Sequence, residues 1–221
     1  MRKFFCLSLL FVIQATDLSA QQNPKYSEIG VSVGNLVYTG PFAADANMGN
    51  WLSETGGRFG LFTRRSLAPW INIGLEMNYG WYTLDDANHG RAQRGISMTT
   101  QVLNTNISTE VFFIRYGKFH WNNNFSPYVK LGMGGNFFSP EIENFGAVGD
   151  DVRLYPFSGQ SINYFFGIGV KFRLAYKHSL AIEWVAHNAG TEKMGGVVAP
   201  SLNPSNDSYG GLFLHYSVLI F

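Results

Sequence analysis

The chain has 221 residues, enough for one domain, and its 16 basic and 15 acidic residues give a formal net charge of +1. It carries no basic stripe, so nucleic acid is a poor candidate partner. Aromatic residues make up 16% and glycines number 25, but no apolar run of about 20 residues follows Ile13. The composition therefore excludes a bundle of membrane-spanning helices.

The first 20 residues have the features of a secretory signal peptide. Arg2 and Lys3 precede an apolar run over residues 4–13, and a small residue, Ala20, marks the expected cleavage point. The alternative is a short membrane anchor, but the run is too short to span a bilayer. We therefore expect a signal peptide at residues 1–20 and a mature barrel at residues 21–221. The single cysteine, Cys6, would be removed with the signal peptide.

Period-2 alternation of apolar and polar or small residues recurs along the mature chain and predicts eight strands. Their expected ranges are residues 26–38, 57–65, 71–82, 99–115, 127–138, 161–174, 179–187 and 209–221. The clearest is 71–82, where every second residue from Ile71 to Trp81 is apolar and the residues between are polar or glycine. A strand of this length suits a bilayer crossing, which needs roughly 9–11 residues. The sequence predicts an all-β fold, an eight-stranded antiparallel transmembrane β-barrel.

The connections alternate in length, as in outer-membrane barrels. Short turns are expected at 66–69 and 175–178, and longer loops at 39–56, 84–96, 139–160 and 188–208. Short turns are periplasmic and long loops external in such barrels, so an even strand count places both termini in the periplasm. The last strand is ambiguous in register; its better apolar face runs from Leu212 to Ile220, and that choice would put Phe221 on the opposite face.

One turn on the periplasmic side, residues 115–126, is longer than its neighbours and is basic and aromatic. It reads either as a hairpin with interfacial aromatic residues or as a docking surface for a periplasmic partner. Arginine and aromatic residues dominate binding hot spots. The candidate partner-binding residues are therefore Arg115, Tyr116, Lys118, Phe119 and Trp121.

Side chains alone can fill the interior of an eight-stranded barrel. Strand parity points Glu28, Glu76, Glu110 and Glu183 inward, against Arg58, Lys130 and Lys171. Buried charges must pair, because an unpaired charge costs several kcal/mol. We therefore expect a salt-bridged plug in the lumen and not a conducting pore.

Enzymatic and metal chemistry have weak support. His215 and Ser217 share a strand face and resemble the His-x-Ser motif of the PagL lipid A deacylases, but Val218 stands where that family has asparagine. The five histidines lack metal-binding spacing. Asp85-Asp86 and Asp150-Asp151 lie in external loops and are interpreted as solvated acids, with calcium binding as the less favoured alternative. We expect no catalytic residue, metal or cofactor.

Several sequence segments in the predicted strands resemble those of the PorG-like outer-membrane barrels of Bacteroidetes, which are associated with type IX secretion. The matching stretches are residues 28–40, 59–80, 110–118, 125–135 and 166–184. This resemblance implies a non-enzymatic barrel in the outer-membrane lipid that anchors or positions the periplasmic ring of the secretion machine, formed by a lipoprotein and its partner. The alternatives are a surface-loop binding module (adhesin or receptor) and a PagL-like lipid A deacylase.

Overall fold

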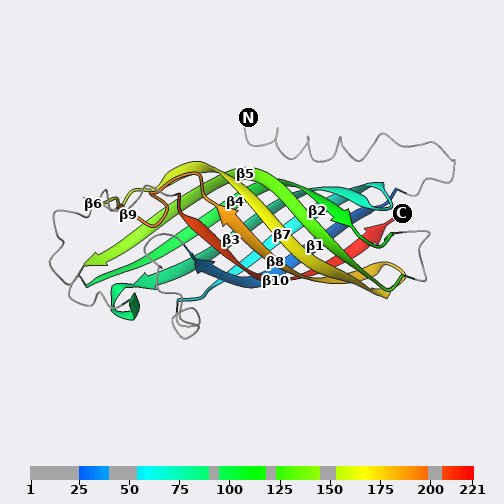
Figure 1. Cartoon of the computed structure of the whole chain (residues 1–221), viewed down its shortest axis with the longest axis horizontal. Coiled ribbons are helices and arrows are strands. Elements are labelled where there is room, and N and C mark those ends of the chain that lie inside the picture. The colour runs from blue at the N-terminus through cyan, green and yellow to red at the C-terminus, as the bar shows by residue number, and fades with distance from the viewer. Residues whose placement is uncertain (1–24, 40–53, 90–94, 118–122, 145–152, 199–205) are drawn as a thin grey trace, which may run out of the picture.

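The computed structural model describes residues 25–39, 54–89, 95–117, 123–144, 153–198 and 206–221 (Figure 1). Eight strands form a closed antiparallel barrel in the order β1-β10-β8-β7-β5-β4-β3-β2. Their bounds are β1 Ser27–Tyr38, β2 Gly56–Ala68, β3 Ile71–Asp85, β4 Ile96–Phe112, β5 Phe125–Asn144, β7 Gly159–Ala175, β8 His178–Asn188 and β10 Ser208–Ile220. The predicted fold class is confirmed. The predicted signal peptide lies outside the described residues.

Alternation sets the two faces of the wall. Ile29, Val31 and Val33 of β1 are about half exposed on the outside, while Glu28 and Ser32, which have the opposite parity on the same strand, are buried. The same rule holds around the barrel, so the outside is an apolar belt and the middle of the lumen is polar, the reverse of a soluble barrel. Within the described residues, no helix is long and apolar enough to span a membrane.

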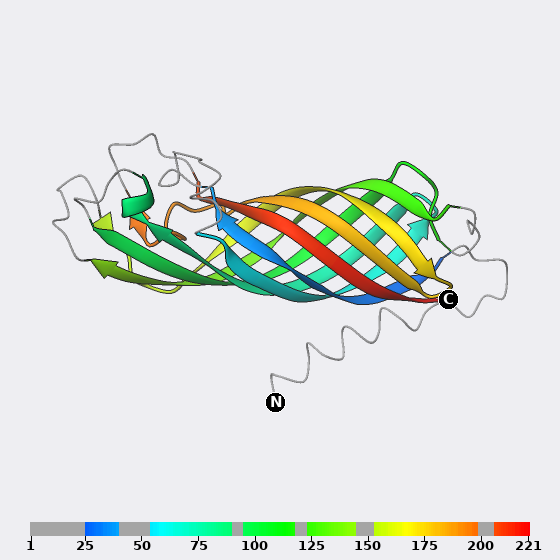
Figure 2. The ribbon, with the colours of Figure 1, turned by 90° about the horizontal axis from the view of Figure 1, so that it is seen from below.

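The barrel has two unlike ends, which Figure 2 shows at opposite ends of its long axis. The terminal end carries Lys25, Phe221 and the turns β2–β3, β4–β5 and β7–β8; the loop end carries the other connections. Phe221 is half buried at the terminal end, where its ring packs edge-on against Tyr26 at 6.5 Å between centroids. Leu212, Leu214 and Ile220 face outward. The sequence left the register of the last strand open, and the structure has the one in which this apolar face points outward.

Several boundaries differ from the sequence prediction at the loop end. β5 continues to Asn144 and β3 to Asp85, because β4 starts at Ile96 and pairs with both along this extension. The predicted loops 84–96 and 139–160 are correspondingly shorter. At the other end, β4 stops at Phe112 and not at residue 115.

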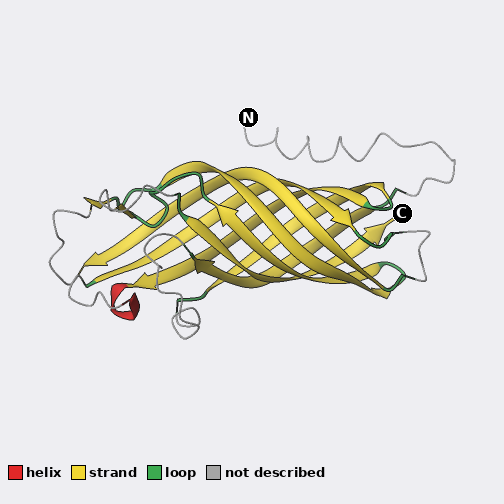
Figure 3. Cartoon of the chain, in the orientation of Figure 1, coloured by secondary structure: helices red, strands yellow, loops and turns green. Residues whose placement is uncertain are grey.

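Two further elements at the loop end were not predicted (Figure 3). β6 (Arg153–Leu154) pairs with β9 (Val197–Val198) in a separate two-stranded sheet, and a 3-10 helix, η2 (Asp86–His89), follows β3. Strands of two residues leave no readable alternation in a sequence. This small sheet joins the loop after β5 to the loop after β8.

Candidate functional site: the filled lumen

A chain of alternating charges fills the middle of the lumen. Arg64 lies at its centre, with guanidinium nitrogens 2.9 Å from Glu110, 3.4 Å from Glu76 and 3.7 Å from Glu28. Lys171 lies 3.0 Å from Glu28 and 3.2 Å from Glu110. These side chains are almost fully buried. Each carboxylate in this part of the network therefore touches two cations.

The network continues on the side of Arg64 that faces the loop end. Lys130 lies 2.8 Å from Glu76 and 2.7 Å from Glu183, and the ring of His215 reaches the same Glu183 at 3.3 Å. The predicted salt-bridged plug is confirmed. Its central cation, Arg64, was missed by the sequence analysis, although it has the same parity as Arg58 on β2.

Arg58 plays a different part from the one predicted. Its guanidinium lies 4.5 Å over the ring of Phe213 and 3.2 Å from Nε2 of His187. Arginine can only donate, so Nε2 of His187 accepts and Nδ1–H faces the oxygen of Asn163, 3.3 Å away. Arg58 thus joins the charged layer to a neutral one, and its charge balances the fourth carboxylate.

The neutral layer consists of interlocked asparagine amides. Asn163 donates to Asn106 at 3.0 Å and to Asn136 at 2.9 Å, and Asn136 also accepts from Asn104 at 3.0 Å. Tyr209 hydrogen-bonds Asn136 at 2.8 Å. A cavity of about 10 Å³ next to this layer is lined by Arg58, His187 and His215 among others. That volume holds about one water molecule, so the described side chains leave little room at this level of the lumen.

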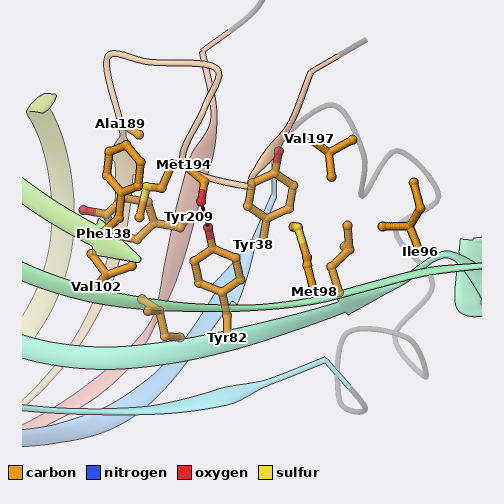
Figure 4. Close-up of a cluster of buried hydrophobic side chains, with 12 residues drawn as sticks. Tyr38, Tyr82, Ile96, Met98, Val102, Phe138, Ala189, Met194, Val197 and Tyr209 are labelled. Carbon is orange, nitrogen blue, oxygen red and sulfur yellow. Dashed lines mark hydrogen bonds between the residues drawn. The ribbon is translucent and has the colours of Figure 1, made fainter. Parts of the chain in front are cut away.

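At the loop end, residues 189–198 fold into the mouth of the barrel; we call them the lid. Met194 and Ala189 are fully buried against Tyr38, Tyr82 and other apolar side chains (Figure 4). Tyr82 and Thr100 both donate to the carbonyl oxygen of Met194 at 3.3 Å. The predicted external loop 188–208 is thus partly a stopper and not only a surface loop.

A buried carboxylate fixes the lid to the wall. Asp207 accepts from Tyr38 at 2.5 Å and from the backbone of Gly195 at 2.9 Å. Burial raises the pKa of the Asp207 carboxyl, while these two hydrogen bonds and one from the backbone of Met194 oppose the rise. Because both Asp207 oxygens accept from different elements, the carboxylate joins β1 to the lid.

The lid requires glycine at Gly196, and this requirement can be tested. Gly196 has φ of +68°, and a Cβ there would lie 2.9 Å from Cβ of Pro140. We expect Gly196→Ala to destabilise the closed lid by about 1–3 kcal/mol and to speed amide hydrogen exchange in the lid about tenfold or more. Gly135→Ala is the matched control, because a Cβ there meets no atom within 4 Å. Equal lid protection in both variants would show that the strain is absent.

Aromatic rings close the terminal end; we call Tyr26, Phe112, Tyr116, Tyr128, Ala181 and Leu219 the terminal cluster. Phe112 packs against Tyr116 and Tyr128 at centroid distances of 5.8 and 5.5 Å. Arg173 stacks over Tyr116 at 4.9 Å and donates to the carbonyl of Gly117 at 2.6 Å. Arg173 therefore holds Tyr116 and Gly117, which follow β4, against the inner side of the barrel wall.

The candidate partner-binding residues do not all lie on one surface. Tyr116 is 1% exposed and points into the lumen, so its ring is not on a docking surface. Burial and the nearby Glu28 carboxylate raise the pKa of the Tyr116 phenol. Arg115 is exposed at the end of the barrel. Lys118, Phe119 and Trp121 lie outside the described residues.

The His215–Ser217 pair is not arranged as a catalytic pair. His215 and Ser217 are both buried in the lumen, where His215 faces Glu183 and Arg64. Ser217 instead shares a hydrogen bond of 2.6 Å with Ser179. A lipid chain on the outside of the barrel cannot reach this serine through the wall, so Ser217→Ala is expected to leave the lipid A acylation pattern unchanged.

Of the acidic pairs interpreted as solvated loop acids, the structure describes Asp85-Asp86, and the interpretation is wrong for Asp86. Asp86 is buried, and its carboxylate accepts from the backbone of Ile96 at 3.3 Å, which is a structural role. Asp150 and Asp151 lie outside the described residues. Across the part of the chain that the structure describes, no group of three or more His, Cys, Asp or Glu side chains could hold a metal ion.

A closed barrel with an apolar outer belt and a filled, charged interior defines the class of membrane-spanning β-barrels. The chain belongs to the outer membrane protein beta-barrel domain family, whose model matches residues 4–212. It is therefore an outer-membrane protein. No curated protein matches the chain significantly.

Solved structures with the same fold include small outer-membrane barrels. Neisserial surface protein A (NspA) has a TM-score of 0.53 at 12% identity, covering 87% of this chain and 96% of its own. A major outer membrane protein from Thermus thermophilus has a TM-score of 0.48 at 14% identity, covering 88% and 99%. At these identities, the likeness to NspA shows the fold alone, and the second similarity is too low to carry an argument.

Proposed function

We propose that this protein is a non-enzymatic outer-membrane barrel that anchors or positions the periplasmic ring of a type IX secretion machine. The observation that carries the proposal is the filled lumen, in which the lid, the asparagine layer, the ion network and the terminal cluster follow one another. A barrel filled in this way is not built for transport through its interior. Its remaining means of action are its outer wall and its two ends.

The lengths of the connections support an orientation of the barrel in the membrane. Two of the terminal-end connections, β2–β3 and β7–β8, are tight turns, whereas the loop-end connections are all long, and long connections face outward in outer-membrane barrels. The β4–β5 connection is the exception, since it is long and lies at the terminal end. We therefore assign the terminal end, with both chain termini, to the periplasm. The ring-forming lipoprotein and its partner, which the PorG-like resemblance implies, would meet this end.

The proposed docking surface is the connection between β4 and β5. Arg115 is exposed there, and Lys118, Phe119 and Trp121 complete the candidate set. Tyr116 would act from inside, because its contacts with Phe112 and Arg173 hold the base of the connection. Arginine and tryptophan at the centre of an interface can each contribute about 2 kcal/mol or more.

The test is recovery of partners from gently solubilised native outer membranes, with an affinity tag inserted in a loop-end connection. The wild-type barrel should bring down periplasmic ring lipoproteins, and the double variant Arg115→Glu/Trp121→Ala should lose them. Arg153→Glu is the matched control, since Arg153 is exposed at the loop end. Recovery of the barrel alone after mild cross-linking would exclude the anchoring role.

A second candidate function is a surface-loop binding module. The observation in its favour is the β6–β9 sheet, which organises two loops into one structure at the loop end. Under this alternative, shortening the connection 188–208 would abolish binding of the barrel to its surface ligand and leave ring recovery intact.

A further inference from the structure

A groove of about 460 Å³ lies on the outer face of the barrel near the loop end. It forms where the wall changes height, because β7 begins at Gly159, opposite Phe138, while β5 runs on to Asn144 and, among the described strands, pairs over this extension with β4 alone. A second feature makes the outer face shallower one row closer to the middle of the barrel. Gly135 has no side chain, and a Cβ there would meet nothing within 4 Å.

The lower row of the groove is continuous with the lipid-facing belt. Tyr79, Leu103, Phe137 and Gln160 lie opposite one another on β3, β4, β5 and β7. Phe137 is 51% exposed, and the next rows toward the middle of the barrel include Ile107 and Met133, each at least half exposed. Acyl chains already cover this belt, so an acyl chain is the natural occupant of the lower row.

The upper row is polar and preorganised. Gln101 and Ser139 lie opposite each other, one row closer to the loop end. Gln101 accepts a hydrogen bond of 2.9 Å from Tyr79, and Ser139 shares one of 2.9 Å with Ser158. The lining has side-chain hydroxyls and amides and no charged side chain. Such groups can donate to and accept from the hydroxyl and amide groups of an acylated amino sugar, whereas they offer no anion to pair with the ammonium of a phosphatidylethanolamine head.

We propose that this groove binds one acylated amino-sugar lipid of the lipid A type from the outer leaflet. Its acyl chain lies along Leu103 and Phe137, and its sugar hydroxyls and acyl amide meet Gln101, Ser139, Ser158 and Gln160. The proposal goes beyond ring anchoring and shares with it only the orientation of the barrel. Because the binding is measured on the purified barrel, its result is independent of whether a ring co-purifies.

The test is native mass spectrometry of the purified full-length mature barrel in mixed micelles with lipid A, and separately with phosphatidylethanolamine. Wild type should retain one lipid A and no more phosphatidylethanolamine than a groove variant does. Leu103→Trp fills the groove from β4 and should lower lipid A retention by about tenfold or more. Gln160→Trp fills it from β7 and should do the same if the first variant fails to fold.

Leu214→Trp is the matched control, since Leu214 is 42% exposed on β10, on the opposite side of the barrel. It should retain lipid A as wild type does. Equal retention in the filled-groove and control variants would overturn the proposal, as would retention of phosphatidylethanolamine in preference to lipid A.

Discussion

Arg64→Met is expected to lower the free energy of unfolding by about 3–5 kcal/mol, since it removes one partner of a buried ionic network. Arg64 is the cation within 4 Å of Glu28, Glu76 and Glu110 together. Its loss leaves the lumen with an excess negative charge and Glu110 with Lys171 as its remaining close cation. Urea unfolding in detergent micelles or liposomes, followed by the mobility difference between folded and unfolded barrel on a gel, measures the change.

Two further variants separate charge from volume. Lys177→Met removes a cation from the exposed β7–β8 turn and should change stability by less than about 0.5 kcal/mol. Arg64→Met/Glu110→Gln restores the charge balance and should be less destabilised than the sum of its two single variants, by about 0.5–3 kcal/mol. Strict additivity would mean that packing, and not charge, sets the cost at Arg64.

Parity along the strands explains why so much of the wall was predictable. Glu28, Glu76, Glu110 and Glu183 lie on the inward side of their strands and are buried, as alternation requires. The same parity would have identified Arg64, which occupies the second inward-facing position after Gly60 on β2. The pairing of each cation was not predictable, because it depends on the stagger between strands that are not neighbours in the chain.

The closures at the two ends depend on contacts that alternation does not encode. Met194 enters the mouth of the barrel from a loop, and β6 pairs with β9, which lies more than 40 residues later in the sequence. Tyr116 looked like a surface residue because it follows the end of a strand. Its ring instead continues the inward parity of Glu110 and Phe112, since stacking on Phe112 and Arg173 keeps the chain on the inner side.

The outer face of the barrel is apolar. A soluble protein of this size would not leave the outer halves of all eight strands apolar, because large exposed patches drive association. Here Leu61, Ile107 and Leu131 are each more than half exposed. The polar residues that would cover the surface of a soluble protein face the lumen here, and apolar residues face outward. The fold therefore requires a bilayer around it.

Ile107→Arg tests this inversion and is the second large expected effect. Ile107 is 56% exposed near the middle of β4 and faces the centre of the apolar belt. An arginine on the lipid face costs about 2–4 kcal/mol at the midplane and about 0–1 kcal/mol near the interfaces. We therefore expect Ile107→Arg to lower the free energy of unfolding in liposomes by about 2–4 kcal/mol.

Leu67→Arg is the matched control, because Leu67 is 50% exposed on the outside at the end of β2, beside the β2–β3 turn. Its cost should stay below about 1 kcal/mol, since an arginine there reaches the headgroups. The difference between the two variants locates the membrane along the barrel independently of any partner. An equal loss of unfolding free energy in Ile107→Arg and Leu67→Arg would contradict the placement of Ile107 near the middle of the bilayer. It would also contradict the placement of the loop-end groove at the edge of the outer leaflet.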